Sequence, residues 1–492
     1  MERIRERFEE YCQAILRSLW RFRTGRDAAL DLEPTDDAFG DVTAGGRIPE
    51  LAGLAESASF ATERDAARRL RIAHERAFVA RRTRALRREC LEAEVHERLR
   101  VADREASYAG WRLRAAAETD AELRARIAEI LDAADQRLLD RRCELGRRAG
   151  EAFAELGYAS PAAFARAAWP TLDVEGWTAQ AARLLDATEA LHHDGQRLRM
   201  EALGSDPARA NRADVLRLRR LAPFEREQAT KRPGAVLAML VRDLDVRLES
   251  SLTLDLELRP RKDWRSFCLA PRIPGEIGVS VLPGAGYATL VELLRRAGEG
   301  LALAFCAGSL PVERRRCGDP GLEALWGELF CARTSDPGFS DELLAGPLQE
   351  PWLRAARAER LAQIRTVAAR VDLELEHASL PGSEDPATVL ERFAQALSWR
   401  SGIALRPASV LADLDVTEPL RSLHRLRGAC LEVRLAEWLR LEFGERFWRA
   451  RRAGELLKEL WNTGTTYDLD GLACELGLGE ISVDPLIESL LS

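Results

Sequence analysis

Thr253-Leu254-Asp255-Leu256-Glu257-Leu258 alternates apolar and polar residues strictly, as a half-buried strand does. Two further short strand candidates follow at 266–269 and 277–282, separated by prolines and a glycine. The sheet then ends at Pro283-Gly284-Ala285-Gly286-Tyr287. Beyond this loop, apolar residues recur every three or four positions and mark one face of a helix: Leu290, Leu293, Leu294, Ala297 and Leu301. The stretch therefore predicts a small sheet over 253–282, followed directly by an amphipathic helix.

The chain before this stretch is predicted to be almost entirely helical. From Phe60 to about Leu203 it is rich in Ala, Leu, Arg and Glu, with apolar residues at helical spacing. A first helix is expected to end near Arg23, and residues 31–49, rich in Asp, Gly, Pro and Thr, are expected to form a loop. We predict a mainly α fold with three parts: an N-terminal helix and linker (1–50), a helical lobe (51–232), and a lobe containing the sheet (233–492).

The composition excludes several classes of protein. Of the 73 basic residues all but three are arginine, which is typical of a GC-rich bacterial genome, and the net charge is -7. Arginine clusters interleaved with Glu and Asp therefore indicate solvated helix faces, and no nucleic-acid partner is expected. The longest apolar run, 300–312, is too short to span a bilayer, so no membrane association is expected. Nine cysteines without Cys-x-x-Cys spacing fit a reducing cytoplasm.

The predicted helix carries Leu293-Leu294-Arg295-Arg296-Ala297-Gly298-Glu299-Gly300. In a His-Glu-x-x-His helix two imidazoles four residues apart bind zinc, and the Glu is the general base. Here those positions hold Arg295, Arg296 and Glu299. A guanidinium has no lone pair for a metal and does not lose its proton. None of the six histidines has a His partner four residues away, so neither a metal nor another cofactor is expected.

The order of these segments resembles the zinc metallopeptidases of the thimet oligopeptidase and oligoendopeptidase F type. The likeness runs through Phe267–Glu276, the following strand, the glycine loop and residues 293–300, and it continues at 318–323, 443–445 and 451–461. It implies a two-lobed, zincin-like helical fold with a deep channel. It also implies that Glu323, in the helix that Asp319 caps, stands where the family has its third zinc ligand.

A second departure from the family lies in Leu420–Gly428, Leu-Arg-Ser-Leu-His-Arg-Leu-Arg-Gly. The resemblance places Arg421 and Arg425 where the family carries tyrosines that stabilise the oxyanion, with His424 between them. The chain is thus identified as a degenerate member of the family, in which the ligands, the base and the oxyanion donors are all replaced. Two states of the vacated site remain open: a buried ion-pair network of Arg295 and Arg296 with Glu299 and Glu323, or side chains solvated in an open channel.

Three functions follow as alternatives. The one we favour is a catalytically inactive pseudo-peptidase that binds a peptide or protein segment in the vestigial channel, with Gly284, Ala285, Gly286 and Tyr287 as a peptide-binding loop. The second is a structural or regulatory partner of an active paralogue. The third, least favoured, is an enzyme, either a metallopeptidase with substitute ligands or another hydrolase. Tryptophans are expected in the core, and an exposed one would bear on ligand binding: Trp264, Trp326, Trp399, Trp448 and Trp461.

Overall fold

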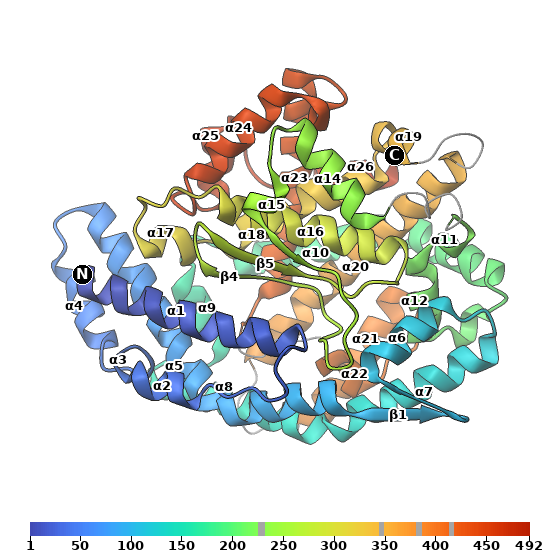
Figure 1. Cartoon of the computed structure of the whole chain (residues 1–492), viewed down its shortest axis with the longest axis horizontal. Helices are drawn as coiled ribbons and strands as arrows, with labels where there is room; N and C mark the ends of the chain where they lie inside the picture. The colour runs from blue at the N-terminus through green and yellow to red at the C-terminus, as the bar shows by residue number, and fades with distance from the viewer. Residues whose placement is uncertain (225–231, 344–348, 380–385, 413–417) are drawn as a thin grey trace.

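A computed structural model of the chain describes residues 1–224, 232–343, 349–379, 386–412 and 418–492, and it is mainly helical (Figure 1). The helices before the larger sheet are α1 (Glu2–Arg23), α2 (Glu33–Ala38), α3 (Gly40–Thr43), α4 (Ile48–Ser57), α5 (Ala61–His96), α6 (Tyr108–Ala117), α7 (Ala121–Arg137), α8 (Leu139–Glu155), α9 (Pro161–Ala168), α10 (Val174–Ala187), α11 (Glu189–Ala202), α12 (Arg212–Arg220), α14 (Pro233–Asp243) and α15 (Leu248–Ser251). Those after it are α16 (Tyr287–Ala304), α17 (Val312–Arg316), α18 (Pro320–Cys331), α19 (Pro337–Leu343), α20 (Gln349–Ser379), α21 (Pro386–Ser401), α22 (Pro407–Ala412), α23 (Arg421–Phe443), α24 (Arg451–Asn462), α25 (Leu469–Glu475) and α26 (Asp484–Leu491). None of the described helices is both long and apolar enough to cross a membrane.

The larger sheet has the three strands that the sequence predicts, in the order β3 (Thr253–Asp255), β5 (Glu276–Ser280), β4 (Phe267–Arg272). β3 runs parallel to β5, and β4 runs antiparallel to it. β3 is shorter than its alternating sequence predicts. The Asp255 carbonyl still accepts from the Val281 amide at 3.2 Å, but the buried ammonium of Lys262 also binds this oxygen and that of Glu257, at 2.8 and 3.0 Å. The Glu257 carbonyl therefore faces Lys262 and not a neighbouring strand.

Helices cover both faces of this sheet. On one face, the ring of Trp20 in α1 packs edge-on against Phe267 of β4, with ring centroids 5.8 Å apart. A side chain at Gly278 would meet that ring at 2.5 Å, so the absence of a Cβ there lets α1 approach. On the other face, Gly300 of α16 lies against Val279 and Cys268. Helix α1 therefore belongs to one layered unit with the sheet and α16, and it lies beside β4 (Figure 1).

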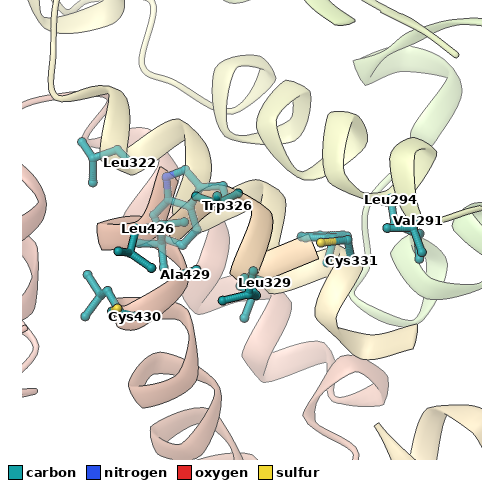
Figure 2. Packing of buried hydrophobic residues seen from close by; sticks show 14 of the residues in the cluster. Val291, Leu294, Leu322, Trp326, Leu329, Cys331, Leu426, Ala429 and Cys430 are labelled. Carbon is teal, nitrogen blue, oxygen red and sulfur yellow. The ribbon is translucent and has the colours of Figure 1, made fainter. Parts of the chain in front are cut away.

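Helices α16, α18 and α23 pack together behind the sheet. Apolar side chains fill the space between them (Figure 2), and those labelled there are Val291, Leu294, Leu322, Trp326, Leu329, Cys331, Leu426, Ala429 and Cys430. Close approach requires glycine at two crossings. A Cβ at Gly298 would lie 2.2 Å from the carbonyl oxygen of Trp326, and one at Gly428 would lie 2.7 Å from that of Gly321. The helix predicted from its apolar stripe is confirmed, with all five stripe residues buried.

Two sequence predictions are wrong. Residues 31–49 contain the short helices α2 and α3, because Val42, 1% exposed, packs into a cluster with α1 and α5. A second sheet also exists, the antiparallel pair β1 (Arg98–Val101) and β2 (Arg104–Ser107). Its strands have only four residues each and lie in an Arg- and Glu-rich stretch that resembles the neighbouring helices. No alternation long enough to predict them is present.

Candidate functional site

Arg295 lies in the middle of α16 and points toward α18. Its Nε donates to Glu328 Oε1 at 3.0 Å, its Nη1 to Glu292 Oε1 at 2.7 Å, and its Nη2 to Gln363 Oε1 of α20 at 3.1 Å. The residue is 5% exposed, and the N–H groups of its guanidinium therefore find oxygen acceptors on three helices. Against the opposing effect of burial, Arg295 and Arg296 lower the pKa of Glu292 to about 2.

Arg296 forms an ion pair with the carboxylate of Glu299. Its Nη1 lies 2.7 and 2.8 Å from the two Glu299 oxygens, and Glu299 is 4% exposed. Burial opposes the charge of Arg296, but Glu299 and Glu292 raise its pKa above the usual value. Ser266 closes the group, since its hydroxyl donates to Glu292 and accepts from Arg296 Nε at 3.4 Å. Of the two states left open by the sequence, the ion-pair network is present, but with different pairs: Arg296 binds Glu299, while Arg295 binds Glu292 and Glu328.

Glu323 faces the same spot from α18, one turn before Gly327. A Cβ at Gly327 would lie 3.0 Å from Arg295 Cγ and 3.1 Å from Glu299 Oε1, so this glycine leaves the room that the network fills. The Glu323 side chain reaches solvent, although protein surrounds it on its other sides. Loss of bulk water and the nearby Glu299 carboxylate raise the pKa of Glu323 to about 7, despite Arg421 and Arg296. Glu323 is thus a solvent-facing carboxyl group and not a closed member of the network.

Arg421 and Arg425 lie one turn apart on α23. The side chain of Arg425 is 35% exposed, and its Nη2 is 4.0 Å from Glu328 Oε1, beyond hydrogen-bonding distance. Glu328 is already engaged by Arg295 and by the thiol of Cys331 at 3.2 Å. Arg421 is exposed and, like Arg296, contributes to the field at Glu323. These two positions therefore combine with the predicted α16 and α18 residues in one site that opens to solvent.

His424 lies elsewhere, although it stands between Arg421 and Arg425 in sequence. It is 3% exposed, and its Nδ1 is 3.1 Å from Asp319 Oδ1, the N-cap residue of α18. Arg427 donates to Asp319 Oδ2 at 3.0 Å, and the Gly321 and Leu469 amides donate to the same carboxylate. Burial lowers the pKa of His424, an effect that Asp319 opposes. The predicted cap at Asp319 is confirmed, and His424 serves this cap.

The predicted peptide-binding loop divides in two. Gly284 and Gly286 have positive φ values of 96° and 58°, and Gly284 is exposed while Ala285 and Gly286 are partly so. Arg220 of α12 donates to the Gly284 carbonyl at 2.6 Å. Tyr287, in contrast, is 1% exposed, and its hydroxyl meets Thr334 Oγ1 at 2.9 Å. Tyr287 fixes the start of α16 in the core, so only residues 284–286 can meet a ligand.

The residues at the site do not fit a zinc ion. Arg295 and Arg296 offer no lone pair to a metal, and both oxygens of Glu299 are already bound by Arg296. Glu323 alone would supply a single carboxylate, whereas a zinc site uses three or four protein ligands. Within the parts of the chain that the structure describes, no group of three or more His, Cys, Asp or Glu side chains is arranged to hold a metal. No step of zinc chemistry is therefore derived for these residues.

Sequence reasoning missed four members of the network: Ser266, Glu292, Glu328 and Gln363. Glu292 precedes Arg295 by three residues and Arg296 by four, a spacing that could have identified it. Glu328 and Gln363 come from other helices and carry no local signal. One tryptophan was also misplaced. Trp399 is 71% exposed beside His193, whereas Trp326, Trp448 and Trp461 are at most 5% exposed, as expected.

Comparisons with known proteins place the fold. No family model matches the sequence, and no curated protein matches it. Solved structures do match. The structure of PZ peptidase A with an inhibitor has a TM-score of 0.68 and 10% sequence identity, and the match covers 93% of this chain and 85% of that chain. The structure of a putative oligoendopeptidase F from Bacillus anthracis str. Ames has a TM-score of 0.63 and 11% identity, with 93% of this chain and 84% of that chain covered. A carboxypeptidase from Pyrococcus furiosus matches at 0.57 and 14% identity, over 100% of this chain and 98% of its own. Identities this low concern the fold alone, and the predicted metallopeptidase-like helical fold is confirmed.

Proposed function

We propose that this protein is a catalytically inactive relative of the oligopeptidase-type metallopeptidases that binds a peptide or protein segment in the channel that the resemblance implies. The observation that carries the proposal is the buried pairing of Arg295 and Arg296 with Glu292, Glu299 and Glu328 on α16 and α18. These ions neutralise one another at the place where the related enzymes need two imidazoles and a general base. None of these paired ions is available to activate water.

Solvent-facing side chains next to the network support a binding role. Glu323, Arg421 and Arg425 line the site from α18 and α23, and the 284–286 loop lies at the start of α16. A small, partly open recess adjoins Arg295 and Glu328 and is also lined by Arg360 and Gln363. Polar groups that converge on an open recess can orient a bound segment.

None of the nine cysteines, all of which lie in the described residues, forms a disulfide, and this supports a location in a reducing compartment such as the cytoplasm. An active paralogue would satisfy the same proposal if a segment of it is what occupies the channel.

A pair of assays tests the proposal. The full chain is incubated with a quenched peptide library to detect cleavage, and its binding to the same peptides is measured by fluorescence anisotropy. We expect saturable binding without cleavage. Cleavage that a chelator abolishes would contradict the proposal, and so would the absence of binding to any peptide or co-purifying protein.

A further inference from the structure

The guanidinium groups around Glu328 outnumber its two carboxylate oxygens. Arg295 Nε binds Oε1 at 3.0 Å, and Arg425 approaches the same oxygen only to 4.0 Å. The other oxygen accepts from Cys331. Arg360 adds a third positive charge to the field at Glu328, while its own ion pair, at 2.8 Å, is with Glu432. The single carboxylate of Glu328 thus lies near several cations, and of these Arg425 is the one that has the weakest ion pair.

Neighbouring carboxylates do not make up the difference. Glu292 is bound by Arg295 and Ser266, and Glu299 by Arg296. Glu323 is partly protonated near neutral pH, since its pKa lies at about 7. Burial and the positive charge of Arg295 lower the pKa of Arg425 to about 10, which means that the surroundings disfavour its charge. An anion placed beside Arg425 would remove that penalty.

We propose that Arg425, with Arg421 one turn earlier on the same face of α23, forms a subsite for a carboxylate, so that the segment bound in the channel is acidic. A planar guanidinium binds a carboxylate through two parallel N–H donors. Arg425 is 35% exposed on its side chain, so it can reach a ligand in solvent, and the exposed Arg421 adds positive charge beside it. The start of α23 does not provide this site, because Glu374 already binds the Ser422 amide and hydroxyl.

This inference rests on the proposed function and names the ligand for it. The carboxylate can come from the C-terminus of a peptide or from an Asp or Glu side chain, since both present the same group. The arginines occupy positions where the resemblance implies tyrosines. A neutral phenol stabilises a transient oxyanion, whereas a guanidinium holds a stable anion.

The test uses anisotropy with the full chain and four labelled peptides of one neutral sequence: a free C-terminal acid, its C-terminal amide, the amide with one internal Glu, and the amide with one internal Lys. We expect at least one carboxylate peptide to bind about tenfold tighter than the neutral amide, with a preference that weakens as salt increases. The free acid and the internal Glu peptide separate the two sources of carboxylate.

Three variants complete the experiment. Arg425→Gln should abolish the carboxylate preference, and Arg425→Lys, which keeps the charge, should retain part of it even if the glutamine variant is unstable. Arg166→Gln is the matched control, a partly exposed arginine on α9 that should change nothing. Peptide binding without any carboxylate preference, or a preference that survives Arg425→Gln, would overturn the subsite and leave the proposed function standing. No binding of any peptide would overturn both.

Discussion

Two charged clusters lie along α18, and they differ in how completely their ions are paired. At its start, the Asp319 carboxylate meets His424, Arg427 and two backbone amides, and His424 and Arg427 are at most 3% exposed. At its far end, Glu328 satisfies Arg295, while Arg425 remains 4.0 Å away and reaches solvent. A closed cluster can only hold the fold together, whereas an open one can also bind a ligand.

The largest effect is expected from Asp319→Ala. The change removes the α18 cap and leaves Arg427 buried with only its partner Asp470, so the free energy of unfolding should fall by about 4 kcal/mol. Urea unfolding measures this loss. Asp120→Ala, which removes an exposed cap from α7, is the matched control and should cost about 1 kcal/mol. Equal losses in the two variants would show that the Asp319 cluster contributes nothing beyond a cap.

Arg295→Ala tests whether the network is structural. It leaves Glu328 without its closest cation and should lower the free energy of unfolding by about 3 kcal/mol, less than Asp319→Ala because Glu292 stays partly solvated. Arg147→Ala, in an exposed pair network on α8, should change the urea midpoint very little. An unchanged midpoint for the Arg295 variant would mean that these ions are effectively solvated.

Gly327→Ala probes the space between the two helices. The new methyl would press on Arg295 Cγ and Glu299 Oε1, and we expect a loss of about 1 to 2 kcal/mol. Gly150→Ala on α8 has no atoms within 4 Å of the added methyl, so it should stabilise the protein slightly through helix propensity. If both alanines stabilise, the network is looser than its distances indicate.

The smallest effect concerns Glu323, whose pKa in the folded state is raised to about 7. Since its unfolded pKa is near 4.5, the unfolded chain releases this proton first, and stability is lost as pH rises from about 4.5 to 7. Glu323→Gln removes that loss, so its melting temperature should exceed that of the wild type at pH 8 but not at pH 4.5. Glu437→Gln, an exposed change on α23, is the control. A pH-independent difference would refute the raised pKa.

Short-range sequence patterns predicted those parts of the fold that depend on residues close together in the chain. The apolar stripe of α16 and the Asp319-Pro320 helix start were predicted correctly, and the alternation at 253–258 predicted a strand that covers 253–255. The layer formed by α1 was missed, because it depends on Trp20 meeting Gly278, residues more than half the chain apart. Expectations for the site failed in the same way. The sequence indicated that Arg295 needs an anion, but Glu328 and Gln363 become its neighbours only when α18 and α20 pack beside α16.

The difference between the two clusters also explains why the sequence misassigned His424. It lies three residues after Arg421 and one before Arg425, so it seemed to share their site. On a helix an adjacent residue points about 100° away, and this rotation carries His424 to the buried side where Asp319 lies. Adjacent residues of α23 thus serve the closed and the open cluster separately.

The central claim is that α16 and α18 carry an ion-pair network at the positions where the resemblance to zinc metallopeptidases implies metal ligands. Metal content, measured by mass spectrometry on protein purified without chelator, tests it most directly. We predict zinc far below one ion per chain, with no rise after dialysis against zinc and removal of excess metal. One zinc per chain, lost with the substitution Glu323→Gln, would contradict the account and show that the site still binds metal.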